Sequence, residues 1–215
     1  MTDFDSLAED VLRTTLDRPG WRLLDVPPGT DPAGLRRLLI DLGRRLAAWY
    51  AARHGGALRF QSLNWFSQLA ATRPHRDGGP DGSVLLLGYE PTLVRSRVEL
   101  LDHSRAAAAL KGMHPRDFLV AHNPLYGDGP ALLAPHAATV PGFDPSRMQV
   151  LAVNNSQLGP GDAPGMLGVL HHAIIEHAPA GAARPIASVL LGLDERGLDE
   201  VALAAFVRDG TGAAV

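Results

Sequence analysis

A series of short apolar segments, separated by turns, fills the middle and the end of this 215-residue chain. The turns between them use many of the 23 glycines and 17 prolines, residues that suit tight turns. Helical patterns come first and the short segments follow, which predicts an α+β fold with a β-barrel or β-sandwich core. The expected strands of that core are residues 57–66, 68–75, 83–89, 95–101, 148–154, 166–175 and 185–193.

Helical patterns precede and interrupt these strands. Residues 4–17 carry apolar side chains on one face, and a short strand is expected from Trp21 to Val26. Asp31 can cap the next helix, with Pro32 in its first turn. Its apolar stripe consists of Leu35, Leu38, Leu39, Leu42, Leu46, Trp49 and Tyr50.

These patterns predict a single domain spanning residues 1–215. Its expected parts are a helical N-terminal part (1–55), a strand core (56–195) with a helical insert at about 103–122, and a C-terminal helix and tail (196–215). The last helix is expected at roughly 197–207.

Composition excludes several classes of protein. The net charge of −3 argues against a nucleic-acid-binding surface, which needs a basic excess. The chain has no cysteine, so disulfides, iron–sulfur clusters and thiolate zinc sites are excluded. No apolar stretch approaches 18 residues, and the acidic start lacks the pattern of a signal peptide. The expectation is a soluble, cytoplasmic protein with no membrane or nucleic-acid partner.

Histidines on two distant segments are the main candidates for chemistry. His75 and Asp77 stand two positions apart, so in a strand they project to the same face. About 95 residues later, an apolar run carries His171 and His172, and Arg184 heads the next apolar run. Two imidazoles and a carboxylate on one face, with open positions, are typical of non-haem iron(II) sites.

The stretch from about 57 to 193 resembles the Fe(II)/2-oxoglutarate-dependent dioxygenase superfamily. The resemblance lies in residues 59–66 leading into Pro-His-Arg-Asp-Gly at 74–78. It continues in His-Ala-Ile at 172–174 and in Arg-Pro-Ile-Ala-Ser at 184–188. It implies a double-stranded β-helix, that is, a jelly-roll or cupin-like barrel, with the N-terminal helices packed on it.

The resemblance also implies a ligand set. Fe(II) would be held by His75, Asp77 and His172. Adjacent histidines in a strand point to opposite faces, so only one of the pair can bind metal, and the alternative third ligand is His171. The family's distal histidine usually has an apolar residue two positions later, which favours His172, although His171 also fits.

The cosubstrate implied by the resemblance is 2-oxoglutarate. Arg184 would pair with its far carboxylate, a task suited to a planar guanidinium. Ser188 shares a strand face with Arg184 and could assist, and Asn154 could also bind the cosubstrate. The implied activity is hydroxylation of a small-molecule substrate by O2, with release of succinate and CO2.

Two other functions remain open at this point. One is a cupin-like metal enzyme that does not use 2-oxoglutarate, and the other is a non-catalytic barrel that binds a small molecule. The chain has no glycine-rich phosphate-binding loop and no Gly-x-Ser-x-Gly motif, so nucleotide-binding and hydrolase functions lack support.

Overall fold

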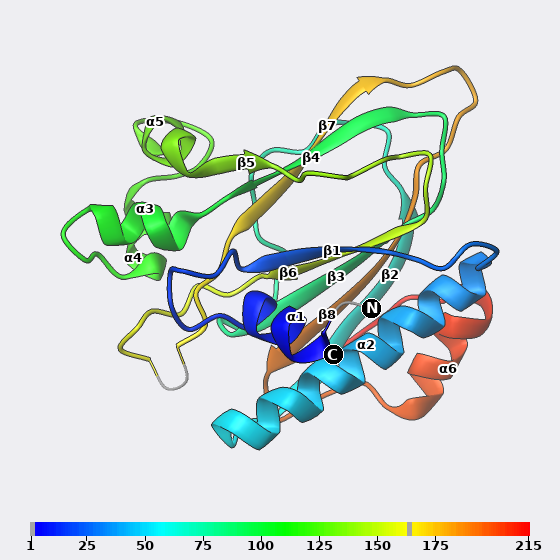
Figure 1. The fold of residues 1–215 in the computed structure, drawn as a ribbon, viewed down its shortest axis with the longest axis horizontal. Coiled ribbons are helices and arrows are strands. Elements are labelled where there is room, and N and C mark those ends of the chain that lie inside the picture. The colour runs from blue at the N-terminus through cyan, green and yellow to red at the C-terminus, as the bar shows by residue number, and fades with distance from the viewer. Residues whose placement is uncertain (1–2, 163–164) are drawn as a thin grey trace.

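A six-stranded antiparallel sheet is the larger of two sheets in the computed structural model, which describes residues 3–162 and 165–215 (Figure 1). Its central strands are almost wholly apolar, as expected for strands covered on both faces. The strands, in spatial order, are β1 (Trp21–Asp25), β6 (Gln149–Asn154), β3 (Ser83–Tyr89), β8 (Pro185–Leu193), β2 (Leu58–Ser67) and β9 (Ala213–Ala214).

The smaller sheet contains three strands in the order β5 (Ala137–Thr139), β4 (Arg95–Leu101) and β7 (Leu170–His177). The segment at 72–75 runs beside β7. The Thr72 amide donates to the Ala173 carbonyl at 3.0 Å, and His75 and His171 exchange backbone hydrogen bonds of 3.1 and 2.9 Å. The expectation of a regular strand at 68–75 is therefore wrong. Pro74 has no amide proton to donate, and only an isolated bridge forms at His75.

The two sheets face each other across an apolar layer. Side chains alternate along each strand, so Leu85 and Leu87 of β3 point toward the smaller sheet and pack with Val98 and Leu100 of β4. Within the described residues the strands form two separate sheets, so two facing antiparallel sheets are observed rather than a closed barrel.

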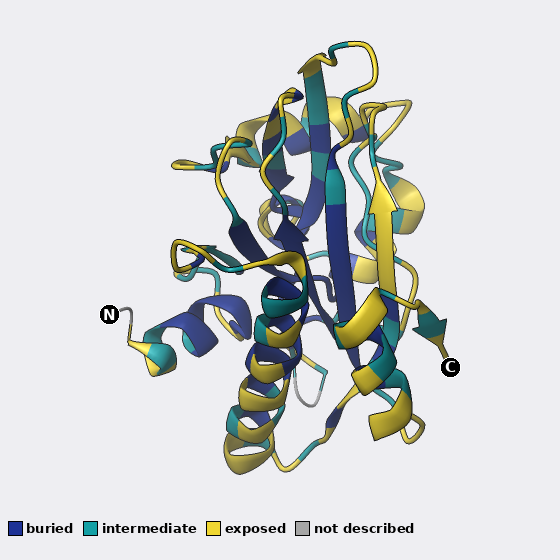
Figure 2. Cartoon of the chain, turned by 90° about the vertical axis from the view of Figure 1, so that its right-hand side faces the viewer, coloured by how far each residue is buried: buried dark blue, intermediate teal, exposed yellow. Residues whose placement is uncertain are grey.

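Three helices pack on the outer face of the larger sheet, as Figures 1 and 2 show: α1 (Phe4–Val11), α2 (Pro32–His54) and α6 (Glu200–Asp209). Their buried side chains meet the alternate residues of β3, β6 and β8. Asp31 caps α2 through the Gly34 amide at 2.6 Å, and Gly55 ends it with a φ of 70°. The prediction that the N-terminal helices pack on the sheet is confirmed.

Helix α1 ends six residues earlier than expected. Its C-cap is Leu12, and the next residue, Arg13, turns inward to form two hydrogen bonds with Asp102, at 2.7 and 2.8 Å. The Arg13 side chain is fully buried. This long-range ion pair fixes Arg13 directly after the C-cap of α1.

The helical insert is longer than the sequence indicated. It contains α3 (His103–Ala109), α4 (Pro115–Ala121), α5 (Gly129–Leu133) and the 3-10 helix η1 (Ala134–His136), and it leads into β5. These elements have their own small apolar core around Phe118 and Leu133. No helix in the described ranges combines the length and apolar character needed to cross a membrane.

Candidate metal centre

His75, Asp77 and His171 form the one group in the described residues with the composition and spacing of a metal site, named here the His–Asp–His group. One ligand atom from each residue lies within 4.8 Å of the others. The Asp77 Oδ1 atom is 3.4 Å from His75 Nε2 and 3.7 Å from His171 Nε2. The two imidazole centroids are 4.4 Å apart.

Strand register decides which of the adjacent histidines joins this group. In the β4–β7 ladder, Leu100 is opposite His171 and Glu99 is opposite His172. Leu100 belongs to the core between the sheets, so His171 faces inward beside it. His172 faces the other way, and its Nε2 atom is 3.1 Å from the Glu99 Oε2 atom.

The structure therefore places the alternative histidine, His171, in the group instead of the preferred His172. The sequence preference rested on the apolar residue two positions after the histidine, and Ala173 and Ile174 satisfy that criterion for both histidines. Only the pairing of β7 with β4 distinguishes them.

The tautomer of His75 is set by the backbone. Its Nδ1 atom lies 2.7 Å from the Arg73 carbonyl oxygen, which can only accept, so Nδ1 carries the proton. The Nε2 atom faces the Asp77 carboxylate at 3.4 Å, so it is the nitrogen that would bind a metal ion once it has released its proton.

The group's electrostatics favour a carboxylate beside a neutral imidazole. Burial, together with the nearby His75, lowers the pKa of His171 to about 4, although the Asp77 carboxylate acts in the opposite direction. Burial would raise the pKa of Asp77, but the His75 hydrogen bond and the nearby positive charges hold it below its ordinary value. The hydrogen bond with Asp77 raises the pKa of His75, against the opposing effect of burial.

A narrow cavity of about 60 Å³ adjoins the His–Asp–His group between the two sheets. Its apolar walls include Leu87, Val98 and Ile186, and Gln68 contributes an amide. Tyr89 also lines the cavity, and burial raises the pKa of its phenol to about 12, so this hydroxyl stays protonated.

Arg184 lies behind this cavity wall and is 1% exposed. It donates from Nε to the Ser96 hydroxyl at 3.1 Å and from Nη1 to the Gln68 side-chain oxygen at 2.5 Å. Its Cζ atom is 5.1 Å from the centroid of the Tyr89 ring. Burial lowers the pKa of Arg184.

The remaining guanidinium nitrogen of Arg184, Nη2, is buried and has no hydrogen-bond partner among the described residues. None of the ion pairs among the described residues involves Arg184. A buried cation without a counter-charge is costly. The guanidinium is therefore suited to receive an anionic group. Gln68, which helps to orient it, was not among the predicted site residues, because no local pattern distinguishes it.

The other two predicted cosubstrate residues differ in orientation. Ser188 is 4% exposed and shares one face of β8 with Ile186 and Leu190, so it faces the interior between the sheets. Asn154 shares the opposite face of β6 with Ala152, which packs toward the helices. Its Oδ1 atom accepts from the Ser156 amide at 3.1 Å, and its side chain is directed away from the His–Asp–His group.

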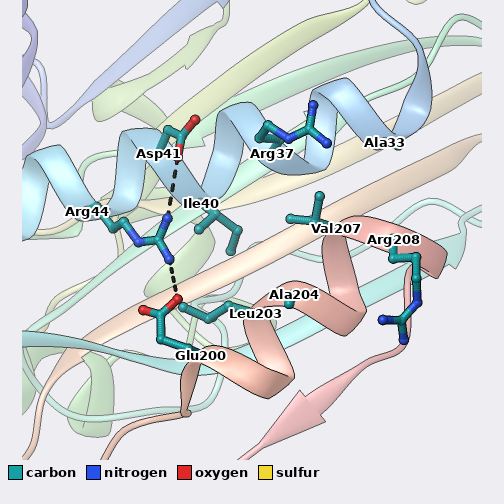
Figure 3. Close-up of a pocket in the computed structure, with 10 residues that line it drawn as sticks. All are labelled: Ala33, Arg37, Ile40, Asp41, Arg44, Glu200, Leu203, Ala204, Val207 and Arg208. Carbon is teal, nitrogen blue, oxygen red and sulfur yellow. Dashed lines mark hydrogen bonds and ion pairs between the residues drawn. The ribbon is translucent and has the colours of Figure 1, made fainter.

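A larger hollow of about 470 Å³ lies between α2 and α6 (Figure 3). Arg44 spans it, 3.6 Å from Asp41 and 2.5 Å from Glu200. Ile40 and Leu203 line it between these charges. Among the described residues that line it there is no histidine, and both of its carboxylates pair with Arg44.

Comparisons with known proteins found no matching family model and no matching curated protein. Among solved structures, the chain is similar to SnoN, a non-heme alpha ketoglutarate dependent epimerase from nogalamycin biosynthesis. The two are 14% identical over 88% of this chain and 82% of SnoN, with a TM-score of 0.48. It is also similar to HygX from Streptomyces hygroscopicus with nickel and 2-oxoglutarate bound: 15% identity, 90% of this chain, 79% of HygX and a TM-score of 0.39. Similarity at this level does not establish a function, so the residues of this chain must support one.

Proposed function

We propose that this protein is a non-haem Fe(II)/2-oxoglutarate-dependent oxygenase that hydroxylates a small molecule, with O2 as oxidant and release of succinate and CO2. One observation carries the proposal. The His–Asp–His group lines a cavity, and a buried guanidinium without a counter-charge among the described residues lies behind its wall, where Gln68 lines the cavity and also binds Arg184.

The donor set fits iron(II). Two imidazoles and one carboxylate converge from one side, which is the arrangement used by non-haem iron oxygenases and leaves further positions open. An iron(II) ion bound there would supply the oxygen chemistry. The chain's part is to hold Asp77 ionised, His171 neutral and His75 in the Nδ1-protonated form, as the hydrogen bonds and pKa directions support.

Arg184 supplies the second part of the proposed site. Its Nη2 atom, which has no hydrogen-bond partner among the described residues, would donate to the far carboxylate of 2-oxoglutarate. The hydrogen bonds to Ser96 and Gln68 fix the orientation of the guanidinium. A charge-assisted hydrogen bond of this kind is strong in a buried setting. Ser188, which faces the same interior, would assist through its hydroxyl.

The strand pairing supports a finer description of the fold. Strands β6, β3, β8 and β2 lie side by side in one sheet, while β5, β4, β7 and the segment at 72–75 lie side by side in the other. From β2 to β4, successive segments lie alternately in the larger and the smaller sheet, which is the pattern of a double-stranded β-helix, a jelly roll in the sense of two facing antiparallel sheets. We propose that fold for the core.

An anaerobic titration tests the function. Protein is mixed with Fe(II) and then with 2-oxoglutarate while the visible absorption spectrum is recorded. A charge-transfer band that needs both additions, and that is absent in His75→Ala, is the expected result. Bound iron without such a band would favour the cupin-like enzyme that does not use 2-oxoglutarate. Failure to bind iron would leave a small-molecule-binding fold without this chemistry.

A further inference from the structure

Asp77 lies where the chain has left strand pairing. The isolated bridge at His75 is the last backbone pairing before the turn at 76–82, which returns the chain to β3. A carboxylate on an unpaired turn would be free to move relative to the two histidines. Another part of the chain must therefore hold this position.

Asn155 provides that hold. It follows β6 directly and is fully buried. The Asp77 amide donates to the Asn155 Oδ1 atom at 2.8 Å, and the Asn155 Nδ2 atom donates to the Asp77 carbonyl at 3.1 Å. The side-chain amide thus binds both backbone groups of Asp77, as a neighbouring strand would.

Further bonds tie Asn155 itself in place. Its Nδ2 atom donates to the Ser83 hydroxyl at 2.9 Å, and its backbone amide donates to the Ser83 carbonyl at 3.0 Å. The Arg76 side chain donates to the Asn155 carbonyl at 3.0 Å and to the Pro80 carbonyl at 2.9 Å, which closes the turn. Asn155 is therefore rigidly joined to the larger sheet on one side and to Asp77 on the other.

We propose that Asn155 is a positioning residue for the metal centre, which fixes the Asp77 carboxylate relative to His75 and His171. This inference rests on the proposed function, because the positioning role presupposes a metal ion bound by the His–Asp–His group. Asn155 has no part in binding the metal directly. It acts through the backbone of one ligand, and its loss would let that ligand move while the two histidines stay in place.

The test is a titration of the purified protein with Co(II) alone, followed by its visible d–d absorption. Asn155→Ala is expected to weaken Co(II) binding about 10- to 100-fold, as is typical when a group supporting a ligand is removed. Its d–d bands should also differ from wild type, because the ligand geometry changes. Asn155→Asp keeps the oxygen that accepts from the Asp77 amide, so its affinity should lie between those of wild type and Asn155→Ala.

Ser156→Ala is the matched control. Ser156 is equally buried and bonds to the Ser83 amide and carbonyl at 3.0 and 3.1 Å, but it makes no hydrogen bond to Asp77. This variant should lose stability and keep wild-type affinity and d–d bands. If Asn155 had only a structural role, Asn155→Ala would likewise lose stability and keep wild-type Co(II) affinity and d–d bands. Wild-type Co(II) affinity in folded Asn155→Ala would therefore overturn the inference.

Further outcomes distinguish failure of the positioning role of Asn155 from failure of the proposed metal centre. If Asn155→Ala does not fold, Asn155→Asp decides alone, and wild-type affinity and bands in that variant would overturn the role. If wild-type protein binds no Co(II) or Fe(II), the proposed metal centre itself fails, and the positioning role fails with it. Tight binding by wild type together with an unaffected Asn155→Ala would remove only the positioning role.

Discussion

Lowering the pH should destabilise this protein through His103, a residue outside the metal centre. His103 is the first residue of α3, is 0% exposed, and neither ring nitrogen has a hydrogen-bond partner among the described residues. Burial is the main cause that lowers its pKa from 6.5 to about 3. The folded protein thus keeps this imidazole neutral under conditions in which the unfolded chain protonates it.

The sign and size of the effect follow from linkage. The unfolded state binds the proton first, so stability is complete above pH 6.5 and falls as the pH drops from there toward 3. Each pH unit in that window costs about 1.4 kcal/mol of unfolding free energy. Between pH 7.5 and pH 5, His103 alone should account for a loss of about 2 kcal/mol.

Urea denaturation of metal-free protein at pH 7.5 and pH 5 measures this loss, with His103→Leu as the comparison. Because the leucine does not titrate, the variant's free energy of unfolding should fall by about 2 kcal/mol less than that of wild type over the same interval. The pKa of His171 is also lowered in the folded protein, so it contributes to the fall as well, but equally in wild type and variant. An identical fall in wild type and variant would refute the argument that His103 is buried in its neutral form.

Three other substitutions test the structure at separate points. Arg184→Ala should weaken 2-oxoglutarate binding about 10- to 100-fold, because one charge-assisted contact is lost. Calorimetric titrations should show an almost unchanged Fe(II) affinity, and equal losses of both affinities would count against the role assigned to Arg184. His171→Ala should abolish Fe(II) binding while His172→Ala preserves it, and the reverse result in the same titration would show that the β4–β7 register is wrong. Asp102→Ala leaves Arg13 buried without its carboxylate and should cost about 3–5 kcal/mol of unfolding free energy; a cost below about 1 kcal/mol, measured by urea denaturation, would mean that this ion pair does not hold the segment after α1.

Much of the core could be predicted because the information is local. The strands at 83–89, 95–101 and 185–193 match their predicted bounds. The first and last are apolar runs, the middle one alternates between exposed and buried residues over most of its length, and a polar residue follows each of them. The strand expected at 166–175 begins only at Leu170. The residues before it hydrogen-bond to other parts of the chain instead: the Leu167 amide donates to Arg13 and the Val169 amide to Asn154.

The site could be predicted only in part, for the same physical reason. The spacing of His75 and Asp77 is local, and the structure brings the two side chains together. The choice between His171 and His172 depends on how β7 pairs with β4, which is a contact between distant segments. The burial of Arg184 and its contact with Gln68 likewise exist only in the folded chain.

The paired backbone of His75 and His171 has a consequence for how the chain holds together. These residues exchange two hydrogen bonds across the widest sequence gap in the site, roughly 95 residues. A metal ion bound by their imidazoles would act as a cross-link that closes this loop. In the chain-entropy treatment used for disulfides, a loop of about 100 residues restricts the unfolded ensemble by about 4–5 kcal/mol. In a chain without cysteine, the bound metal would thus act as a reversible cross-link, and its removal would weaken the pairing of the 72–75 segment with β7 in the smaller sheet.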